Sequence, residues 1–179
     1  MLQRELPRVL VISHNVFSTT SSMGKTLSAF FKGWDLDKLA QLYFHSEVPN
    51  SPICKNYYRI TDFDLLKSIF KRQDVGDILT ENDICENRAN TRTDKGIKSG
   101  IYQYGRKRKP YMYCGRNLLW RLGKWHTPQL EEWIDQFNPQ TIFFAAGDYI
   151  FSFEIALSIA ESRGNFYRYN RGDYLHKRG

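Results

Sequence analysis

Apolar runs alternate along this chain with stretches whose apolar residues recur every three to four positions. The runs at 9–12 and 141–146 predict buried strands, and residues 38–45 predict another. Apolar residues at helical spacing predict helices near 23–34 and 128–137. Buried strands that alternate with helices are typical of a parallel sheet covered on both faces. We therefore expect an α/β fold in which three strands are adjacent or near in one parallel sheet, at about 8–13, 39–45 and 141–146.

Cap residues mark the start of a further helix and both ends of the helix near 128–137. Thr61 stands before one helix with Asp64 three residues later, in a position like that of a capping box. Thr127-Pro128 predicts the start of the next helix, and Asn138-Pro139 its end. The apolar face of the helix after Thr61 is expected to consist of Phe63, Leu66, Ile69 and Phe70.

Two more helices are predicted from spacing alone. One is short, from Arg116 to Lys124, with Leu118, Leu119 and Leu122 turned inward. The other runs from 149 to 162, and its expected apolar face is Ile150, Phe153, Leu157 and Ala160. Tyr57–Ile60 is expected to form a short third strand.

The domain organisation follows from where polar residues gather. Residues 73–100 are polar and charged, which predicts an insertion that is either a mobile loop or holds a short helix around 77–87. Residues 165–179 form a basic tail without an aliphatic run. We expect one domain over 1–164, followed by that tail.

Composition limits the classes of protein to which this chain can belong. The 179 residues carry a net charge of +7, so the chain either meets an anionic partner or is merely kept soluble by its charge. Three widely spaced cysteines form no zinc motif, and they fit a reducing cytoplasm. No apolar window is long enough to cross a membrane, and we expect neither a metal nor a tightly bound cofactor.

The loop and helix after the first strand contain Gly24-Lys25-Thr26. A helix that begins at such a loop directs free N–H groups at one point and suits a phosphate or a sugar acceptor. A P-loop would need glycine where Thr19 stands, so an NTPase is only the third hypothesis. A plain helix start with an exposed lysine is the structural alternative.

Polar residues also follow two of the predicted strands. His14 and Asn15 come directly after the first strand, and Asp148 follows the strand at 141–146. Ligands of open α/β sheets bind beyond the carboxyl ends of the strands. Asp148 is therefore the candidate catalytic base, and His14 and Asn15 are candidate ligand contacts. Equally, Asp148 is suited to cap the following helix, and His14 to form a loop hydrogen bond.

A basic cluster, Arg106-Lys107-Arg108-Lys109, is surrounded by tyrosines. Cations among aromatic rings suit an anionic membrane surface, or single-stranded nucleic acid. A solvated loop is the simpler interpretation. The chain has none of the sequence motifs of nucleic-acid-binding domains, which makes the membrane surface the preferred partner.

Several segments resemble one enzyme family. The pattern VLVISHNVFS, GKTLSAFFKGW, KLAQLYFHSEVP and YYRITDFDLLKSIF is similar to the N-terminal domain of bacterial family 4 glycosyltransferases, and so is WIDQFNPQTIFFAAGDYIFSFEIALSIAESRG. The likeness covers roughly residues 8–72 and 125–164. It implies a Rossmann-like domain that is half of a two-domain glycosyltransferase. The family pattern would continue with another apolar strand after Ser162-Arg163-Gly164, which this chain lacks.

The resemblance implies a function as well. In that family the N-terminal domain binds mainly the acceptor, and the C-terminal domain binds the nucleotide-sugar donor. The chain is then expected to bind a glycan or lipid-linked acceptor at the inner face of the membrane, and to be inactive without the donor-binding domain. The alternative is a non-enzymatic basic α/β module that binds nucleic acid or phosphate.

Overall fold

The computed structural model describes residues 6–71, 75–80, 110–163 and 167–169. Its strands form one sheet in the order β4-β3-β2-β1-β5-β6. All neighbouring strands are parallel except β3 and β4. The strands are β1 (Val9–Ser13), β2 (Leu39–Tyr43), β3 (Asn56–Arg59), β4 (Asp77–Leu79), β5 (Thr141–Ala145) and β6 (Tyr167–Tyr169). The prediction of an α/β fold with the three apolar strands adjacent is confirmed, because β1 lies between β2 and β5.

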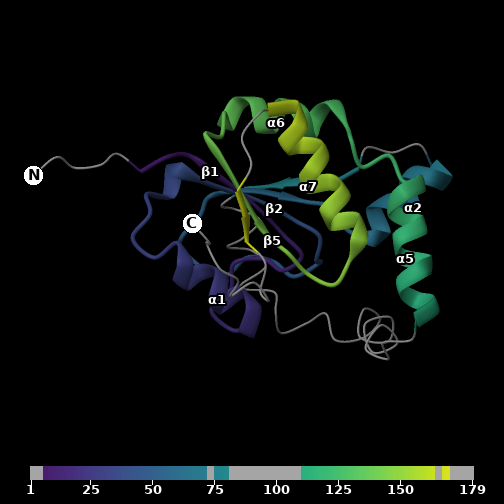
Figure 1. Cartoon of the computed structure of the whole chain (residues 1–179), viewed down its shortest axis with the longest axis horizontal. Helices are drawn as coiled ribbons and strands as arrows, with labels where there is room; N and C mark the ends of the chain where they lie inside the picture. Colours follow the sequence, from purple (N-terminus) through teal and green to yellow (C-terminus); the bar gives the residue numbers. More distant parts are fainter. Residues whose placement is uncertain (1–5, 72–74, 81–109, 164–166, 170–179) are drawn as a thin grey trace, which may run out of the picture.

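Helices cover both faces of the sheet (Figure 1). On one face, α6 and α7 pack with Trp120 of α5 on Leu10, Leu42 and Phe144. On the other face, Leu27 of α1 and Phe31 at its C-cap pack in a cluster with Val11 and Tyr43 of the sheet. The helices are α1 (Ser22–Phe30), α2 (Asp62–Lys71), α5 (Pro110–Leu122), α6 (Pro128–Phe137) and α7 (Ile150–Arg163), with a 3-10 turn at Leu36–Lys38. None of the helices described here is both long and apolar enough to span a bilayer.

The predicted caps of α2 and α6 are confirmed. The N–H and hydroxyl of Thr61 both donate to Asp64 Oδ2, at 2.8 and 2.7 Å, while Asp64 N–H donates to Thr61 Oγ1. Thr127 Oγ1 accepts from Leu130 N–H, and Pro128 follows it in the first turn of α6. Asn138 ends α6 in the left-handed conformation, with φ of 48°. Local chemistry therefore sets these boundaries.

The polar segment after α2 contains a strand where a helix was one of the two expectations. Asp77–Leu79 forms β4, which pairs antiparallel with β3, so no helix begins at residue 77. Val75 is buried just before it. The remainder of the predicted insertion lies largely outside the described residues. Of the predicted basic tail the structure describes Tyr167–Tyr169, which form β6 and pair parallel with β5, so a further strand does follow α7.

The inward faces of three helices differ from the expectation. In α2 the buried residues are Leu65 and Ser68, while Phe63, Leu66, Ile69 and Phe70 are exposed. In α5, Leu118 and Leu122 are exposed and Trp120 is buried. In α7, Ile150 and Leu157 are exposed, and the core side is Phe151, Ile155, Ala156, Ile159 and Ala160. Apolar residues occur on all sides of α7, so their spacing in the sequence does not identify its buried face.

Candidate functional site

The candidate site lies at the carboxyl edge of the sheet, where the strand order reverses. β2 lies on one side of β1 and β5 on the other. The register pairs Ser13 with Ala145, so the segments that follow, from His14 and from Ala146, leave the sheet side by side. Such a switch point is where open α/β sheets bind ligands. The expectation that His14 and Asp148 follow adjacent parallel strands is therefore met.

His14 sits in an aromatic environment at this edge. Its ring centroid lies 4.8 Å from that of Tyr149 and 5.6 Å from that of His45. Its Nδ1 is buried and has no hydrogen-bond partner within the part of the chain that the structure describes. Burial, and then the positive charge of Arg116 and the ring of His45, lower the pKa of His14 to about 3. The imidazole is thus neutral near pH 7.

His45 follows β2 and is a second neutral imidazole. Its Nδ1 accepts a hydrogen bond from the Glu47 N–H at 3.2 Å, which assigns the ring proton to Nε2. Burial lowers the pKa of His45, although the nearby Glu47 carboxylate acts in the opposite direction. Two uncharged rings that donate or accept hydrogen bonds therefore lie beyond the carboxyl ends of β1 and β2, beside the switch point.

Arg116 of α5 supplies the positive charge beside these rings. Its Nε donates to Asp62 Oδ1 at 2.9 Å, and its guanidinium lies 4.2 Å from the centroid of the Tyr149 ring. Trp120 Nε1 donates to the same Asp62 oxygen at 2.6 Å. The ring of Tyr113 stacks on that of Tyr149, with 5.4 Å between the two centroids. Asp62 thus holds Arg116 over the aromatic ring that contacts His14.

Sequence reasoning did not select His45, Asp62, Arg116 or Tyr149 as site residues. His45, Asp62 and Tyr149 each come within four residues of the end of a parallel strand. The rule that selected His14 and Asp148 applies to them equally. Arg116 has no such signal, because it comes from a helix that only the fold brings to this edge.

Gln41 positions the loop that carries His14. This side chain is fully buried in β2, where Nε2 donates to Ser13 Oγ at 2.8 Å and to Asn15 O at 3.1 Å. Its Oε1 accepts from Phe17 N–H at 2.9 Å. One amide therefore satisfies polar groups on both sides of His14 and fixes the path of residues 13–17.

We expect Gln41→Leu to lower the free energy of unfolding by about 2 kcal/mol, because Phe17 N–H loses its buried acceptor and Asn15 O keeps only Ser13 Oγ as a donor. Urea denaturation measures this loss. Asn56→Leu is the control, because the Asn56 amide donates to Leu39 O at the opposite end of the strands. A site-specific role for Gln41 requires that amide exchange of residues 14–17 accelerates in Gln41→Leu alone. Equal acceleration in both variants would contradict it.

The Gly24-Lys25-Thr26 segment lies one turn inside α1, which begins at Ser22 with Ser21 as its N-cap. The helix therefore starts two residues before the Gly24-Lys25-Thr26 segment. Ser18 Oγ accepts from the N–H groups of Thr20 and Ser21, and Ser21 Oγ accepts from Gly24 N–H. A phosphate at this helix start would have to displace hydroxyl groups that already satisfy these donors.

The environment of that loop also contains a carboxylate. Ser18 Oγ donates to Glu47 Oε1 at 3.2 Å, and Asn50 Oδ1 accepts from Thr19 N–H at 2.6 Å. Lys25 and Thr26 are exposed, and the Thr26 hydroxyl donates to Ser22 O. Phosphate binding at residues 24–26 stays a prediction, and the surroundings of Ser18 are those of a self-capped loop.

Asp148 is exposed just before α7, and Tyr149 O accepts from Ser152 N–H and Oγ. Asn15 O accepts from Ser13 Oγ as well as from Gln41. No hydrogen bond or ion pair joins Lys25 to Asn15 or Asp148 in the described ranges. The switch-point geometry also predicts that Gly24, Lys25 and Thr26 border one ligand cleft with Asn15 and Asp148. That cleft and a catalytic role for Asp148 stay predictions. The predicted basic cluster Arg106-Lys107-Arg108-Lys109 lies outside the described residues.

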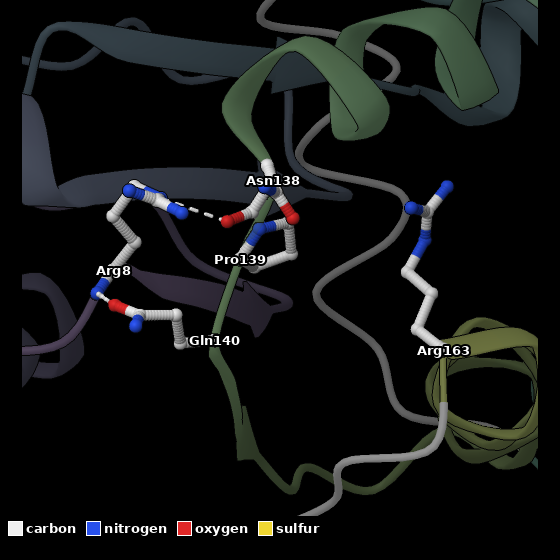
Figure 2. A pocket seen from close by; sticks show the side chains of 5 residues that line it. All are labelled: Arg8, Asn138, Pro139, Gln140 and Arg163. Atoms are coloured by element: carbon white, nitrogen blue, oxygen red, sulfur yellow. Dashed lines mark hydrogen bonds between the residues drawn. The ribbon is translucent and has the colours of Figure 1, made fainter.

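Two hollows open at the opposite, amino edge of the sheet. One, of about 610 Å³, is lined by Arg8, Asn138, Pro139, Gln140 and Arg163 (Figure 2). Most of its polar groups have partners: Arg8 Nε donates to Asn138 O, and Arg8 N–H donates to Gln140 Oε1. The terminal nitrogens of Arg163 pair with Glu131 and Asp135, and its buried Nε has no partner among the described residues. The other hollow, of about 470 Å³, shares Arg8 and Asn138. We place the candidate site at the carboxyl edge because the two histidines with lowered pKa values lie there, in contact with each other.

The comparisons with known proteins add no identity. No family model matches the chain, and neither a curated protein nor a solved structure matches it. Among the described residues, no three histidine, cysteine, aspartate or glutamate side chains gather as metal ligands would. The chain is thus shown to be an α/β protein with a mostly parallel sheet, and hypotheses on its function rest on the chemistry of the carboxyl edge.

Proposed function

We propose that this chain is the Rossmann-like, acceptor-binding domain of a glycosyltransferase, with its acceptor site at the carboxyl edge between β1 and β5. The observation that carries the proposal is the contact of His14 with Tyr149 across the switch point, with His45 and Arg116 beside it. The resemblance of the sequence to family 4 glycosyltransferases supplies the reaction class.

The chemistry of this edge suits a sugar. Neutral imidazoles form directional hydrogen bonds with hydroxyl groups without requiring a charged ligand. Aromatic rings such as Tyr149 and Tyr113 offer flat apolar surfaces, and sites for small ligands combine such surfaces with a few polar groups. Arg116 adds a cation suited to the phosphate of a lipid-linked acceptor.

The residues at this edge would have different roles in the sugar transfer. His14 and His45 would orient the acceptor through hydrogen bonds, because a pKa near 3 makes His14 a weak base. Asp148, exposed at the same edge, would take the proton from the attacking hydroxyl. The donor, a nucleotide-sugar, would be held by the second domain, as the resemblance implies.

We expect methyl glycosides to bind at the carboxyl edge, and His14→Phe to weaken this binding by about tenfold, as the loss of one hydrogen bond predicts. The variant keeps a ring against Tyr149 and removes both ring nitrogens. The measurement is an NMR titration of the isotope-labelled chain with methyl glycosides of common hexoses, followed through amide shifts.

His126→Phe is the matched control, because His126 is an exposed histidine whose Nε2 pairs with Glu131 at 2.7 Å. It should bind the glycosides as the unaltered chain does. Shifts that map to the hollow at Arg8, or no shifts with any glycoside, would contradict the proposal. Binding of Mg²⁺-ATP that depends on Lys25 would instead support an NTPase.

A further inference from the structure

Helix α2 exposes a continuous apolar side, here called the α2 stripe: Phe63, Leu66, Ile69 and Phe70. Phe70 is 81% exposed and Phe63 is 63% exposed. The opposite side of the helix is buried. There Leu65 packs so closely on Gly123 that a Cβ added to Gly123 would lie 2.7 Å from Leu65 Cδ2. Apolar stripes of this kind on a soluble domain usually mark an interaction surface.

The neighbouring helix α5 adds apolar and positive groups. Helices α2 and α5 lie together at one end of the sheet (Figure 1). Leu118 and Leu122 of α5 are exposed, and Leu122 is 65% exposed. The charged residues from 110 to 124 are all cations: Arg116, Arg121 and Lys124. On α2 the Lys67 ammonium lies 4.4 Å from the Phe63 ring centroid.

The carboxylates of α2 do not offset these cations on the exposed side. Asp62 accepts from Arg116 and Trp120, and Asp64 accepts from Thr61. Both groups are therefore turned to internal partners. What remains outward is apolar side chains flanked by lysine and arginine, which is the composition of a helix that lies in a bilayer interface.

We propose that the α2 stripe and the exposed end of α5 form a docking surface for an anionic membrane. The apolar side chains would enter the boundary between headgroups and acyl chains, and Lys67, Arg121 and Lys124 would meet anionic headgroups. A symmetric contact between two copies fits less well, because it would bring the same cations together.

The placement of the surface has a consequence for the candidate site. Asp62 and Arg116, which hold the aromatic cluster at the carboxyl edge, belong to the same two helices. Docking would therefore hold that edge close to the headgroups, where a lipid-linked acceptor is found. This consequence rests on the proposed function, whereas the docking does not.

The test is flotation of the purified chain with large vesicles of phosphatidylcholine, alone or with one quarter phosphatidylglycerol. We expect binding to the anionic vesicles that weakens as salt rises from 50 to 300 mM. Phe63→Ser with Phe70→Ser should lower the vesicle-bound to free ratio at least tenfold. The control pair, Phe30→Ser with Leu157→Ser, changes exposed apolar residues of α1 and α7 and should leave this ratio within twofold.

Circular dichroism melting would verify that both double variants are folded, as expected for exposed positions. The proposal is overturned if the unaltered chain ignores anionic vesicles, or if the variant pair on α2 binds them as well as the control pair does. Loss of binding only when Arg106, Lys107, Arg108 and Lys109 become glutamine would also overturn it. The proposal would also be overturned if the unaltered chain formed a dimer that does not float with vesicles, and if Phe63→Ser with Phe70→Ser dissociated that dimer. The surface would then be covered by a second copy of the chain.

Discussion

Replacing Gly24 with alanine is expected to lower the free energy of unfolding by about 3 kcal/mol, although alanine favours helices. A Cβ at this position would lie 2.4 Å from Ser18 Cβ and 2.6 Å from both Ser21 Oγ and Val16 O. The two serines hold the self-capped loop, and Val16 O is backbone that cannot move alone. The substitution therefore combines overpacking with damage to a cap, each of which costs about 1 kcal/mol or more.

Gly115→Ala is the matched control for this prediction. Gly115 lies inside α5, and nothing is within 4 Å of a Cβ built there. Alanine should raise the free energy of unfolding by about 0.8 kcal/mol, because glycine carries a larger entropy cost in a helix. Urea denaturation of both variants measures the two opposite effects. Equal, small effects would show that α1 does not pack closely on the loop.

The Gly24-Lys25-Thr26 segment could serve close packing or anion binding, and a Lys25 variant distinguishes these two roles. If glycine serves close packing, Lys25→Ala leaves stability within 0.5 kcal/mol of the unaltered chain, because Lys25 is exposed. If the segment serves an anion, phosphate should stabilise the chain and Lys25→Ala should abolish that stabilisation. The two outcomes are distinguished by adding phosphate to the same denaturation experiment.

The arrangement of the strands was predictable because it depends on the least ambiguous pattern. The runs at Val9–Ile12 and Ile142–Ala146 are apolar without interruption, which is typical of a strand covered on both faces. Cap residues such as Thr61 and Thr127 fixed helix starts through their own side chains. These signals are local and do not depend on which partner a helix meets.

The inward faces of α2 and α7 were not predictable in the same way. In α2 the more apolar side is the exposed one, because Asp62 bonds to Arg116 and Trp120 and turns Leu65 toward α5. A polar anchor thus overrides apolar spacing. The anchor joins residues 54 and 58 positions apart, so no window along the sequence contains both partners.

The candidate site was predictable only in part for a related reason. His14 and Asp148 could be selected because they follow strands, and the structure places those segments at neighbouring positions. Arg116 comes from α5, far along the chain, and its place over Tyr149 depends on Asp62. The perturbed state of His14 depends on burial, which the sequence does not express.

Acidification is expected to destabilise the protein strongly through His14. Unfolded, this histidine takes up a proton near pH 6.5, whereas in the folded chain its pKa is about 3. Between these values the unfolded state binds more protons, so the free energy of unfolding falls as the pH drops below 6.5. From pH 7.5 to pH 4.5 the loss from His14 alone is about 2.5 kcal/mol. The lowered pKa of His45 acts in the same direction.

His14→Phe isolates this contribution, because phenylalanine keeps a ring beside Tyr149 and does not titrate. At pH 7.5 the variant should differ from the unaltered chain by at most about 1 kcal/mol, since the Nδ1 that it removes is buried without a partner in the described structure. At pH 4.5 it should be the more stable of the two by about 2 kcal/mol. Urea denaturation at half-unit steps of pH measures both curves. Parallel curves would mean that His14 is protonated in the folded state, and the cluster at the carboxyl edge would then carry a second positive charge beside Arg116.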